Sequence, residues 1–473
     1  MTIHCALDVL GRIVRITCLA LLCSGAIAGA ARSDASTASD TIPLTAEQVR
    51  RLAAAALQAE DYATAIQIAR GLLQADPEDP IAYFILSKAH GALGDATLSR
   101  KAARYAYRYS DAPEDRFLAG QMAAKSAVDE ERYSLAQLWL RRSAIHAEHP
   151  NQQDVVARDY QALRRLNPWS MQLNIALRPS SNVNNGSEDA LQIIEGVPVT
   201  GFLSGAAQAL SGLIFTADLS ARYRLRSSET SATHAGVRIY TRHVALSDSA
   251  QNQAPGLRNS DLSQQFFETS LQHAQKAKNG TVGGTFAIGQ SWYGNNPTYR
   301  FARASLRRVW ETDERGHVGL TGTIEDRNSV TGQRYDATAY SLTVFAGRTL
   351  GNGDALRLTL GLRDTDAWFI NDRSQAASFR AAYSFAEAMG PVKVDLAVTF
   401  GYADYDEYRS GFIVVPGGRQ DRSIYADVNL MFEDWDYAGF SPSLRIRAGK
   451  TSSNDSRFST RELSVGLGIE SKF

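Results

Sequence analysis

Apolar and polar side chains alternate at successive positions through most of the sequence that follows Trp169. Between residues 213 and 225 every odd position is apolar or aromatic, whereas Asp218 and Arg222 lie among the even positions. A period of two is that of a β-strand whose two faces meet different surroundings. A soluble β-sandwich also alternates, but long strands with Arg and Asp on the second face are typical of membrane barrels, which have hydrocarbon outside and water in the lumen.

Such segments recur to the end of the chain, and an even number of antiparallel strands closes a barrel. The fourteen segments begin near Met171, Leu213, Ala232, Gln264, Thr281, Tyr299, His317, Ala337, Asp354, Gln375, Pro391, Ser423, Phe440 and Arg461. The last has apolar residues at every second position and ends in Phe473, a pattern typical of the terminal strand of outer-membrane barrels. We predict that residues 169–473 form a 14-stranded antiparallel transmembrane β-barrel.

The sequence from residue 44 to 168 has a helical pattern instead, with many alanines and with apolar residues three or four positions apart. Pro77, Pro113 and Pro150 are spaced 36 and 37 residues apart, and a weaker turn recurs within each period. This resembles tetratricopeptide repeats, which are helix pairs of about 34 residues with a proline near the end of each unit. A generic helical bundle is the alternative. We predict a tetratricopeptide-like repeat domain over 44–168, and hence an α + β multidomain fold.

Tyr105, Tyr107 and Tyr109 lie with Arg104 and Arg108 in the second of these repeats. A stack of helix pairs has a concave groove that commonly holds an extended peptide, and these side chains would line it. The alternative, which we favour, is that the tyrosines pack between neighbouring units.

The N-terminus has the features of an export signal. Arg12 and Arg15 flank the start of an apolar stretch, and the small residues at 26–30 are suited to cleavage. We therefore expect residues 1–30 to be a signal peptide that is removed and residues 31–43 to be a linker. All three cysteines lie within the first 23 residues, so the mature chain would have neither a disulfide nor a thiolate metal site.

Composition and motifs argue against several classes of function. The chain carries 50 basic and 50 acidic residues, so no net charge favours binding to nucleic acid. It contains no serine-hydrolase, zinc-protease or phosphate-binding motif. His146 and His149 are three residues apart, but nothing near them completes a metal site. We predict that the protein is not an enzyme and has no catalytic residue, no cofactor and no metal.

Arginines on the polar face of the predicted strands are expected to face the lumen. They are Arg222, Arg224, Arg226, Arg357, Arg363, Arg445 and Arg447. If unpaired, they would favour the passage of anions. The alternative, which the neutral overall charge favours, is that carboxylates on neighbouring strands pair with them and stiffen the wall. The candidate carboxylates are Asp218, Asp395, Glu462 and Glu470.

Two further segments carry a resemblance to a known family. The first predicted strand ends in a Ser-Asn-Val-Asn sequence. The last pair of predicted strands begins with a Gly-Phe-Ser-Pro sequence and ends with the terminal phenylalanine. With the repeats, this arrangement resembles the surface lipoprotein assembly modulator (Slam) family over residues 45–473. The residues that carry the family motif are Asn182, Val183, Asn184, Gly439, Phe440, Pro442 and Phe473. The resemblance implies a 14-stranded barrel that helps lipoproteins or secreted proteins to cross the outer membrane.

We therefore expect a translocation or assembly factor in the bacterial outer membrane, with the repeat domain in the periplasm. The repeats would bind a client, either a surface lipoprotein or a secreted protein, and the barrel would assist its passage. Other expected partners are outer-membrane lipid and the barrel assembly machinery, which would recognise the C-terminal strand; the protein is expected to be monomeric. The alternative is an exporter or pore for polysaccharide or small solutes, although such repeat-bearing exporters usually have more repeats.

Overall fold

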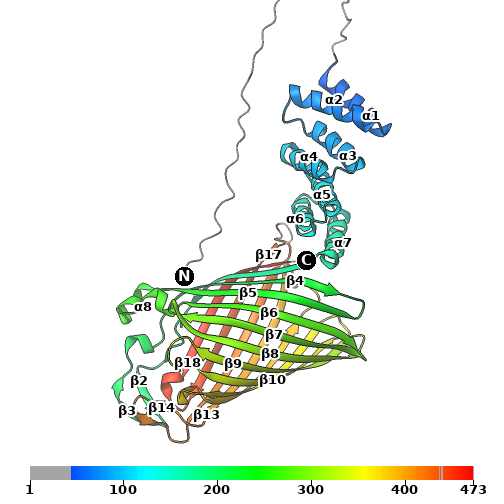
Figure 1. Ribbon diagram of the computed structural model, residues 1–473. Helices are drawn as coiled ribbons and strands as arrows, with labels where there is room; N and C mark the ends of the chain where they lie inside the picture. Colours follow the sequence, from blue (N-terminus) through cyan, green and yellow to red (C-terminus); the bar gives the residue numbers. More distant parts are fainter. Residues whose placement is uncertain (1–43, 436, 438–439, 472–473) are drawn as a thin grey trace, which may run out of the picture. The chain divides into compact units, whose positions relative to one another are not determined.

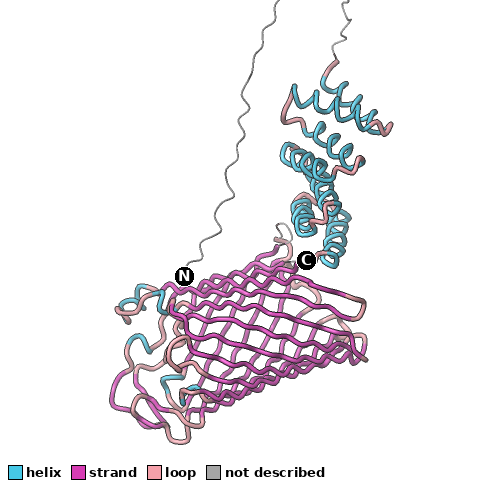
Figure 2. The backbone as a smooth tube through the Cα atoms, viewed as in Figure 1, coloured by secondary structure: helices cyan, strands magenta, loops and turns pink. Residues whose placement is uncertain are grey.

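The computed structural model describes residues 44–435, 437 and 440–471. The expected signal peptide and linker lie outside these residues, as do Gly439 and Phe473. In the described part, seven helices come first along the chain and a closed barrel follows, as Figures 1 and 2 show. No described helix is both long and apolar enough to cross a membrane.

The helices form antiparallel pairs, each packed against the next. They are α1 (Ala46–Gln58), α2 (Tyr62–Ala75), α3 (Pro80–Ala92), α4 (Ala96–Tyr109), α5 (Pro113–Asp129), α6 (Tyr133–Ala144) and α7 (Pro150–Leu166). Three helices begin with proline, whose fixed φ and missing N–H suit the first helical position. Pro77, which the predicted repeat spacing used, lies in the turn between α2 and α3, and Pro80 begins α3. The predicted tetratricopeptide-like repeats are confirmed.

Small side chains let the helices approach closely. The buried core of α1 to α4 includes Ala53, Ala65, Ala69 and Ala82, whereas α5 and α6 pack around the larger Trp139. The helix pairs are also tied by polar contacts, which are strongest where few atoms are exposed to water. These contacts add to the apolar packing between the helix pairs.

One polar contact joins the second and third pairs. Arg100 Nε on α4 donates to both carboxylate oxygens of Glu130, at 3.0 Å each, and Glu130 follows directly after α5. Burial alone would raise the pKa of Glu130, but the hydrogen bonds from Arg100 and Thr97 bring that pKa below its usual value. Glu130 is therefore ionised in the folded protein at neutral pH.

The barrel has fourteen antiparallel strands in the order β1-β18-β17-β16-β13-β12-β11-β10-β9-β8-β7-β6-β5-β4. The strands are β1 (Trp169–Ser180), β4 (Gly212–Ser227), β5 (Ser231–Leu246), β6 (Gln264–Ala277), β7 (Gly280–Tyr293), β8 (Asn296–Asp313), β9 (Gly316–Ser329), β10 (Ala337–Thr349), β11 (Ala355–Ala367), β12 (Ser374–Ser384), β13 (Val392–Tyr405), β16 (Arg419–Phe432), β17 (Phe440–Ser453) and β18 (Thr460–Ser471). Each predicted strand start falls within a few residues of an observed one. The predicted fold class is confirmed.

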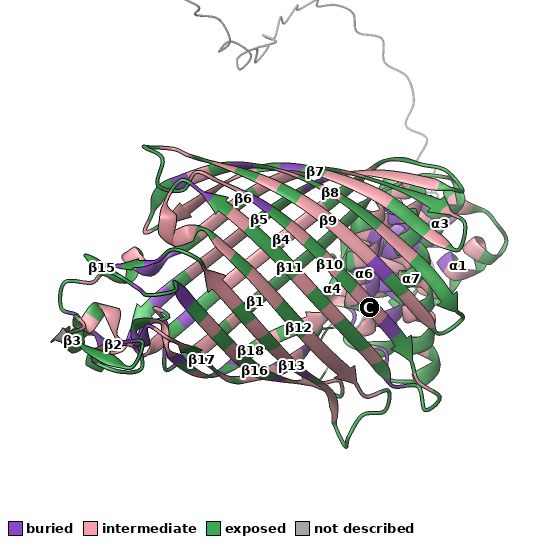
Figure 3. Ribbon diagram, turned by 90° about the horizontal axis from the view of Figure 1, so that it is seen from below, coloured by how far each residue is buried: buried purple, intermediate pink, exposed green. Residues whose placement is uncertain are grey.

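The outer face of the barrel is apolar over most of its height. One row in register across five strands consists of Val344, Leu360, Phe379, Phe400 and Ile424, all of them exposed. Figure 3 shows the resulting bands of exposed and half-buried residues along the strands. A continuous apolar band of this kind is what a barrel needs to cross a bilayer.

The two ends of the barrel differ in the length of their connections. At the end where β1 begins, the turns are the short segments 228–230, 278–279, 314–315, 350–354, 385–391 and 433–439. The other end carries the long segments 181–211, 247–263 and 406–418, which contain the small elements β2 (Leu191–Ile194), β3 (Val197–Phe202), α8 (Asp248–Gln253), β14 (Arg409–Ser410) and β15 (Ile413–Val414) (Figure 1). We call these the short-turn end and the long-loop end. Because α7 leads directly into β1, the helices are joined to the short-turn end.

Candidate functional site

Ion pairs link several strands along one side of the lumen. Arg238 on β5 donates to Asp218 on β4 at 2.7 Å and is in register with Glu268 on β6. Glu268 accepts a hydrogen bond from Arg303 on β8, which also lies 3.7 Å from Glu325 on β9. Ion pairs therefore join β4 with β5 and β6 with β8 and β9, and Arg238 and Glu268 bring the two groups side by side on the inner face.

A second group of ion pairs is centred on Asp427 of β16, which is only 5% exposed. Its carboxylate lies 3.1 Å from Arg380 of β12, 3.2 Å from Arg445 and 3.8 Å from Arg447, both of β17. Arg447 Nε is also 3.9 Å from Glu462 on β18. One carboxylate thus holds three guanidinium groups from two other strands, which restrains this part of the wall.

Arg224 donates to the carbonyls of Arg165 and Leu166 at 2.9 and 2.8 Å, at the end of α7. Five of the other predicted lumen arginines fall into two sets. Arg445 and Arg447 belong to the Asp427 group, and Arg363 lies 3.9 Å from Glu325. For Arg222 and Arg357, by contrast, no ion pair is recorded among residues 44–471 that the structure describes. The sequence left two alternatives open for these arginines, and the described residues contain examples of both. Some arginines pair with carboxylates, and others have no recorded ion pair and could contact a passing anion.

A β-bulge alters the position of Arg226. On β4 the register shifts between Arg224, which pairs with His234, and Arg226, which pairs with Thr233. Thr233 is on the same face of β5 as Val237, which is exposed on the outside of the barrel. The extra residue thus places Arg226 on the outer side of the ladder, whereas strict alternation predicts that it faces the lumen.

The sequence interpretation missed most partners of these arginines. Asp218 and Glu462 do form ion pairs, but Asp395 and Glu470 each accept a hydrogen bond from Asn429 instead. The carboxylates and arginines that were not singled out are Arg238, Glu268, Arg303, Glu325, Arg380 and Asp427. All lie on the inner face in the same alternation, so that pattern could have identified them as lumen residues, although not which of them pair.

The Ser-Asn-Val-Asn segment folds back the long loop after β1. Asn182 forms a pair of hydrogen bonds with the backbone of Gly186, both 2.8 Å long, and Asn184 donates to the carbonyl of Gln208 at 2.8 Å. A Cβ at Gly186 would come within 2.2 Å of the Gln208 carbonyl oxygen, so only glycine fits there. From sequence this segment is simply a polar turn; in the structure it closes the loop into a fixed shape.

Arg242 on β5 anchors the loops from the inner face. Its guanidinium donates to the carbonyl of Val183 at 2.6 Å and to the carbonyl of Leu262 at 3.1 Å. Val183 itself is fully buried in a small apolar cluster with Leu210 and Ile214. One lumen arginine therefore ties the loops 181–211 and 247–263 to the barrel wall.

The remaining family-motif residues lie at the start of β17. Phe440 is its first residue and is exposed, and Pro442 is in register with Ile469 of β18. Gly439 and Phe473 lie outside the described residues, so the structure gives no account of them.

The helical domain presents a repeated row of exposed side chains, which we call the lysine row. Gly94 in the turn after α3 and Glu131 in the turn after α5 both have positive φ, so they are equivalent positions of two repeats. When the repeats are aligned on these two residues, Ile81 is equivalent to Leu118 and Lys88 is equivalent to Lys125. Within each helix the two residues are seven apart and share a face. All four are exposed, and α3 packs beside α5. Neither lysine has an ion pair recorded in the described part of the chain.

The predicted tyrosine set divides between packing and exposure. Tyr107 packs edge-on against Trp139 of α6 and hydrogen-bonds His146 at 3.0 Å, as expected for a residue between units. Tyr105 and Tyr109 instead stack with Tyr83 of α3, with centroids 5.1 and 5.8 Å away. Burial raises the pKa of Tyr83, and its two tyrosine neighbours raise it further.

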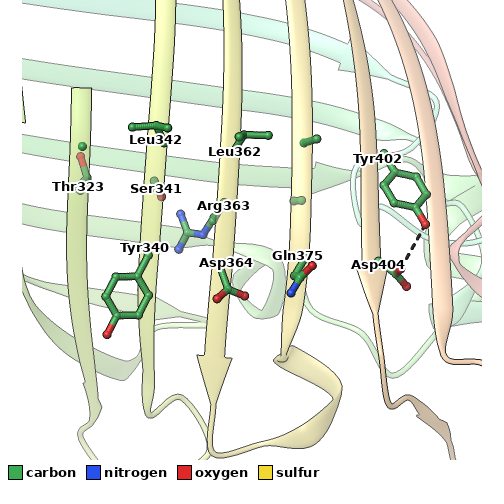
Figure 4. A pocket seen from close by; sticks show the side chains of 13 residues that line it. Thr323, Tyr340, Ser341, Leu342, Leu362, Arg363, Asp364, Gln375, Tyr402 and Asp404 are labelled. Atoms are coloured by element: carbon green, nitrogen blue, oxygen red, sulfur yellow. Dashed lines mark hydrogen bonds between the residues drawn. The ribbon is translucent and has the colours of Figure 1, made fainter. Parts of the chain in front are cut away.

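The barrel wall has an open pocket of about 620 Å³, seen in Figure 4. Leu342 and Leu362 line the side nearer the middle of the barrel, and Tyr340, Asp364 and Asp404 line the side nearer the long-loop end. Tyr402 donates a hydrogen bond of 3.3 Å to Asp404, drawn as a dashed line in Figure 4. The pocket marks the level at which the outer surface changes from apolar to polar, as at the edge of a bilayer core.

No protein-family model matches this chain, and no curated protein matches it, so the resemblance to the Slam family stays a prediction. Among solved structures, it is similar to the Yersinia enterocolitica type III secretion chaperone SycD in complex with a peptide of the translocator YopD, with 20% identity over 25% of this chain and 92% of that chain, at a TM-score of 0.23. It is also similar to a bacterial polysaccharide outer membrane secretin, with 11% identity over 64% and 98% of the two chains, at a TM-score of 0.32. Pseudomonas aeruginosa OprD gives 9% identity over 63% and 94%, at a TM-score of 0.31.

Proposed function

We propose that this protein is a bacterial outer-membrane translocation factor for polypeptides. Its helical repeats bind a client in the periplasm, and its barrel assists the passage of that client to the cell surface. On the family resemblance, the client is a surface lipoprotein or a secreted protein. No covalent chemistry is needed for this function, and we propose that the protein is not an enzyme.

The location is supported by the barrel itself. A closed 14-stranded antiparallel sheet with an apolar outer face satisfies every requirement for crossing a bilayer with strands. Outer-membrane barrels have short periplasmic turns and long external loops. The helices are joined to the short-turn end, so on this rule they are in the periplasm, where an exported client arrives.

The lysine row is the observation that carries the client-binding role. Two equivalent apolar residues and two equivalent lysines are exposed on neighbouring helices, and neither lysine has an ion pair recorded in the described residues. Repeated side chains at one repeat spacing can contact an extended peptide at regular intervals. The charges favour a client segment that combines acidic and apolar residues.

One observation favours the second candidate, a pore for polysaccharide or small solutes. Arg222 and Arg357 face the lumen and have no recorded ion pair in the described residues, so they remain available to attract an anion. Planar-bilayer recordings separate the two, because a pore gives steady anion-selective currents.

A deletion strain tests the proposed function. Without the gene, we expect proteins at the protease-accessible surface to be lost and to accumulate in the periplasm, as measured by surface shaving and mass spectrometry. The wild-type gene should restore them, the double variant Lys88→Glu/Lys125→Glu should not, and the control Lys101→Glu on α4 should restore them. An unchanged surface proteome in the deletion strain would rule out polypeptide translocation and favour the pore.

A further inference from the structure

Three basic residues lie close together on the outer face of the barrel. They are Arg422 on β16, Lys450 on β17 and Arg461 on β18, three strands that lie side by side (Figure 3), and all three residues are exposed. Asp427 and Arg447 face the lumen at odd positions of β16 and β17, so positions 422 and 450 face outward, and the register puts Arg461 on the same face as Lys450. We call these three residues the basic trio.

The register of the strands brings these like charges together. Lys450 and Arg461 are directly opposite each other on β17 and β18. Arg422 is opposite Ser452, which makes it a diagonal neighbour of Lys450. Directly opposed residues have Cβ atoms about 4.5 to 5.5 Å apart, diagonal neighbours are about 7 to 8 Å apart, and like charges directly opposite each other destabilise a sheet. The basic trio therefore lowers the stability of the barrel unless an anion lies between its members.

Carboxylates of the protein neutralise only part of this charge. Arg461 lies 3.2 Å from Glu188, but its side chain remains 69% exposed, and an exposed ion pair of this kind is weak. Asp404 of β13 is a diagonal neighbour of Arg422, but its recorded contact is a hydrogen bond from a tyrosine. Neither Arg422 nor Lys450 has an ion pair recorded in the part of the chain that the structure describes. These two cations are therefore available to an external anion.

The basic trio lies at the edge of the apolar band. Toward the short-turn end the outward positions of the three strands are apolar; they are Ile424, Ala426 and Val428 of β16, Ile446 and Ala448 of β17, and Leu463, Val465 and Leu467 of β18. Toward the long-loop end the next outward positions are the polar Gln420 and Ser452. Arg422 is in register with Tyr402, which lines the pocket at the same edge. Outer-membrane barrels have long external loops, so this edge meets the headgroups of the outer leaflet.

The same edge is acidic elsewhere on the barrel. Asp326 of β9, Asp364 of β11 and Asp404 of β13 face outward near the long-loop ends of their strands. These carboxylates repel the phosphate groups of a lipid, whereas basic residues near a membrane surface attract them. Charge therefore directs a phosphorylated lipid to β16, β17 and β18.

We propose that the basic trio binds the phosphate groups of a diphosphorylated glycolipid in the outer leaflet, with the acyl chains of that lipid along the apolar band. Arginine can bind a phosphate through two parallel hydrogen bonds, and lysine adds a point charge. A single phosphodiester would leave the basic trio positively charged, whereas two phosphate groups neutralise it more fully. The bound lipid replaces the repulsion between Lys450 and Arg461 with attraction to a shared anion. This inference concerns the outer wall of the barrel and does not depend on polypeptide translocation.

Native mass spectrometry of the full-length protein in detergent tests this inference. The probe is diphosphorylated lipid A, and EDTA is present so that no divalent cation bridges its phosphates to Asp364 or Asp404. We expect the protein to retain one bound lipid A. Dephosphorylated lipid A with the same acyl chains should bind about tenfold more weakly or worse. Inorganic pyrophosphate, which has the phosphates without the acyl chains, should give no bound species at the same concentration.

Variants assign the binding to the basic trio. Lys450→Gln removes one charge and should weaken lipid A binding about fivefold, whereas Lys450→Arg keeps the charge and should bind like the parent. The matched control is Arg300→Gln, because Arg300 is an exposed outward arginine on β8 whose register partners Gln290 and Asn328 are uncharged. The control should bind lipid A like the parent. Heat-modifiable gel mobility confirms that each variant has folded.

Stability gives a second readout, because repulsion within the basic trio and binding of the lipid act in opposite directions. In phosphatidylcholine vesicles, Lys450→Gln should leave the urea midpoint unchanged or raise it, since a repulsive contact is removed. Lipid A in the vesicles should raise the midpoint of the parent more than that of Lys450→Gln, because a ligand stabilises the folded state that binds it.

Equal lipid A affinities of Lys450→Gln and Arg300→Gln would overturn the inference, as would equal binding of lipid A with and without its phosphates. Pyrophosphate binding as tight as that of lipid A would show that the basic trio takes a soluble anion, which would also overturn the lipid site. Equal increases of the urea midpoint in the parent and Lys450→Gln would count against it in the same way. None of these results depends on the surface proteome of the deletion strain.

Discussion

Removal of the Asp427 carboxylate should destabilise the barrel. In Asp427→Asn the shape is kept, but Arg380, Arg445 and Arg447 lose their shared anion and face one another across the inner wall. A hydrogen bond to a charged group contributes about 1.5 to 3 kcal/mol, and the loss of one partner of a buried pair costs more. The three arginine side chains are 33 to 56% exposed, so water screens part of this. We expect a loss of about 2 to 3 kcal/mol in the free energy of unfolding.

The measurement is urea unfolding in lipid vesicles, followed by tryptophan fluorescence and by gel mobility. Asp395→Asn is the matched control, because Asp395 is also a lumen carboxylate but its recorded contact is a single hydrogen bond of 3.3 Å from Asn429. The control should change stability by less than about 0.5 kcal/mol. Equal effects of the two substitutions would show that the three arginines do not depend on Asp427, and the account of the second ion-pair group would be wrong.

Two further predictions concern the helices and the long loop. Because the pKa of Glu130 is lowered in the folded state, its contact with Arg100 stabilises the helices above the unfolded-state pKa, and that stability is lost as the pH falls through the folded-state value. Far-UV circular dichroism should therefore show a smaller decrease in melting temperature below about pH 4.5 for Glu130→Gln than for the parent; equal pH profiles would contradict this. Gly186→Ala should make the loop 181–211 more susceptible to proteases, because the new Cβ would lie 2.2 Å from the Gln208 carbonyl oxygen. The control Gly256→Ala has open space around the new Cβ and should not change cleavage. Equal cleavage of the two variants would count against the proposed role of this turn.

The strands could be predicted because their signal is local. Each strand separates hydrocarbon from water, so its own sequence alternates whatever the identity of its neighbours. The same local rule predicts that Arg445 and Arg226 both face inward; Arg445 pairs with Asp427, whereas a register shift precedes Arg226. The bulge at residue 225 depends on the register of β4 with β5, so the alternation of β4 alone could not predict it.

The pairing of charges could not be predicted because it depends on register between strands. Arg380 and Asp427 are 47 residues apart in the chain and lie on strands separated by β13. Their contact requires the register of two junctions and a small inner residue, Ala397, between them. The same is true of Tyr107, whose packing on Trp139 follows from the geometry of the helix pairs and not from its own neighbours in sequence.

The short connection between the helices and the barrel bears on how strongly the repeats need to bind. Asn167 directly follows α7 and is held by hydrogen bonds to Ser134 and Gln137, and Pro168 is the only residue between it and β1. A client held on the repeats is thus tethered to the short-turn end of the barrel. Tethering converts the second binding step into an intramolecular one, with an effective concentration in the millimolar range for short links. On the proposed function, the lysine row therefore needs only modest affinity, and a weak hold also lets the client leave the repeats when the barrel takes it.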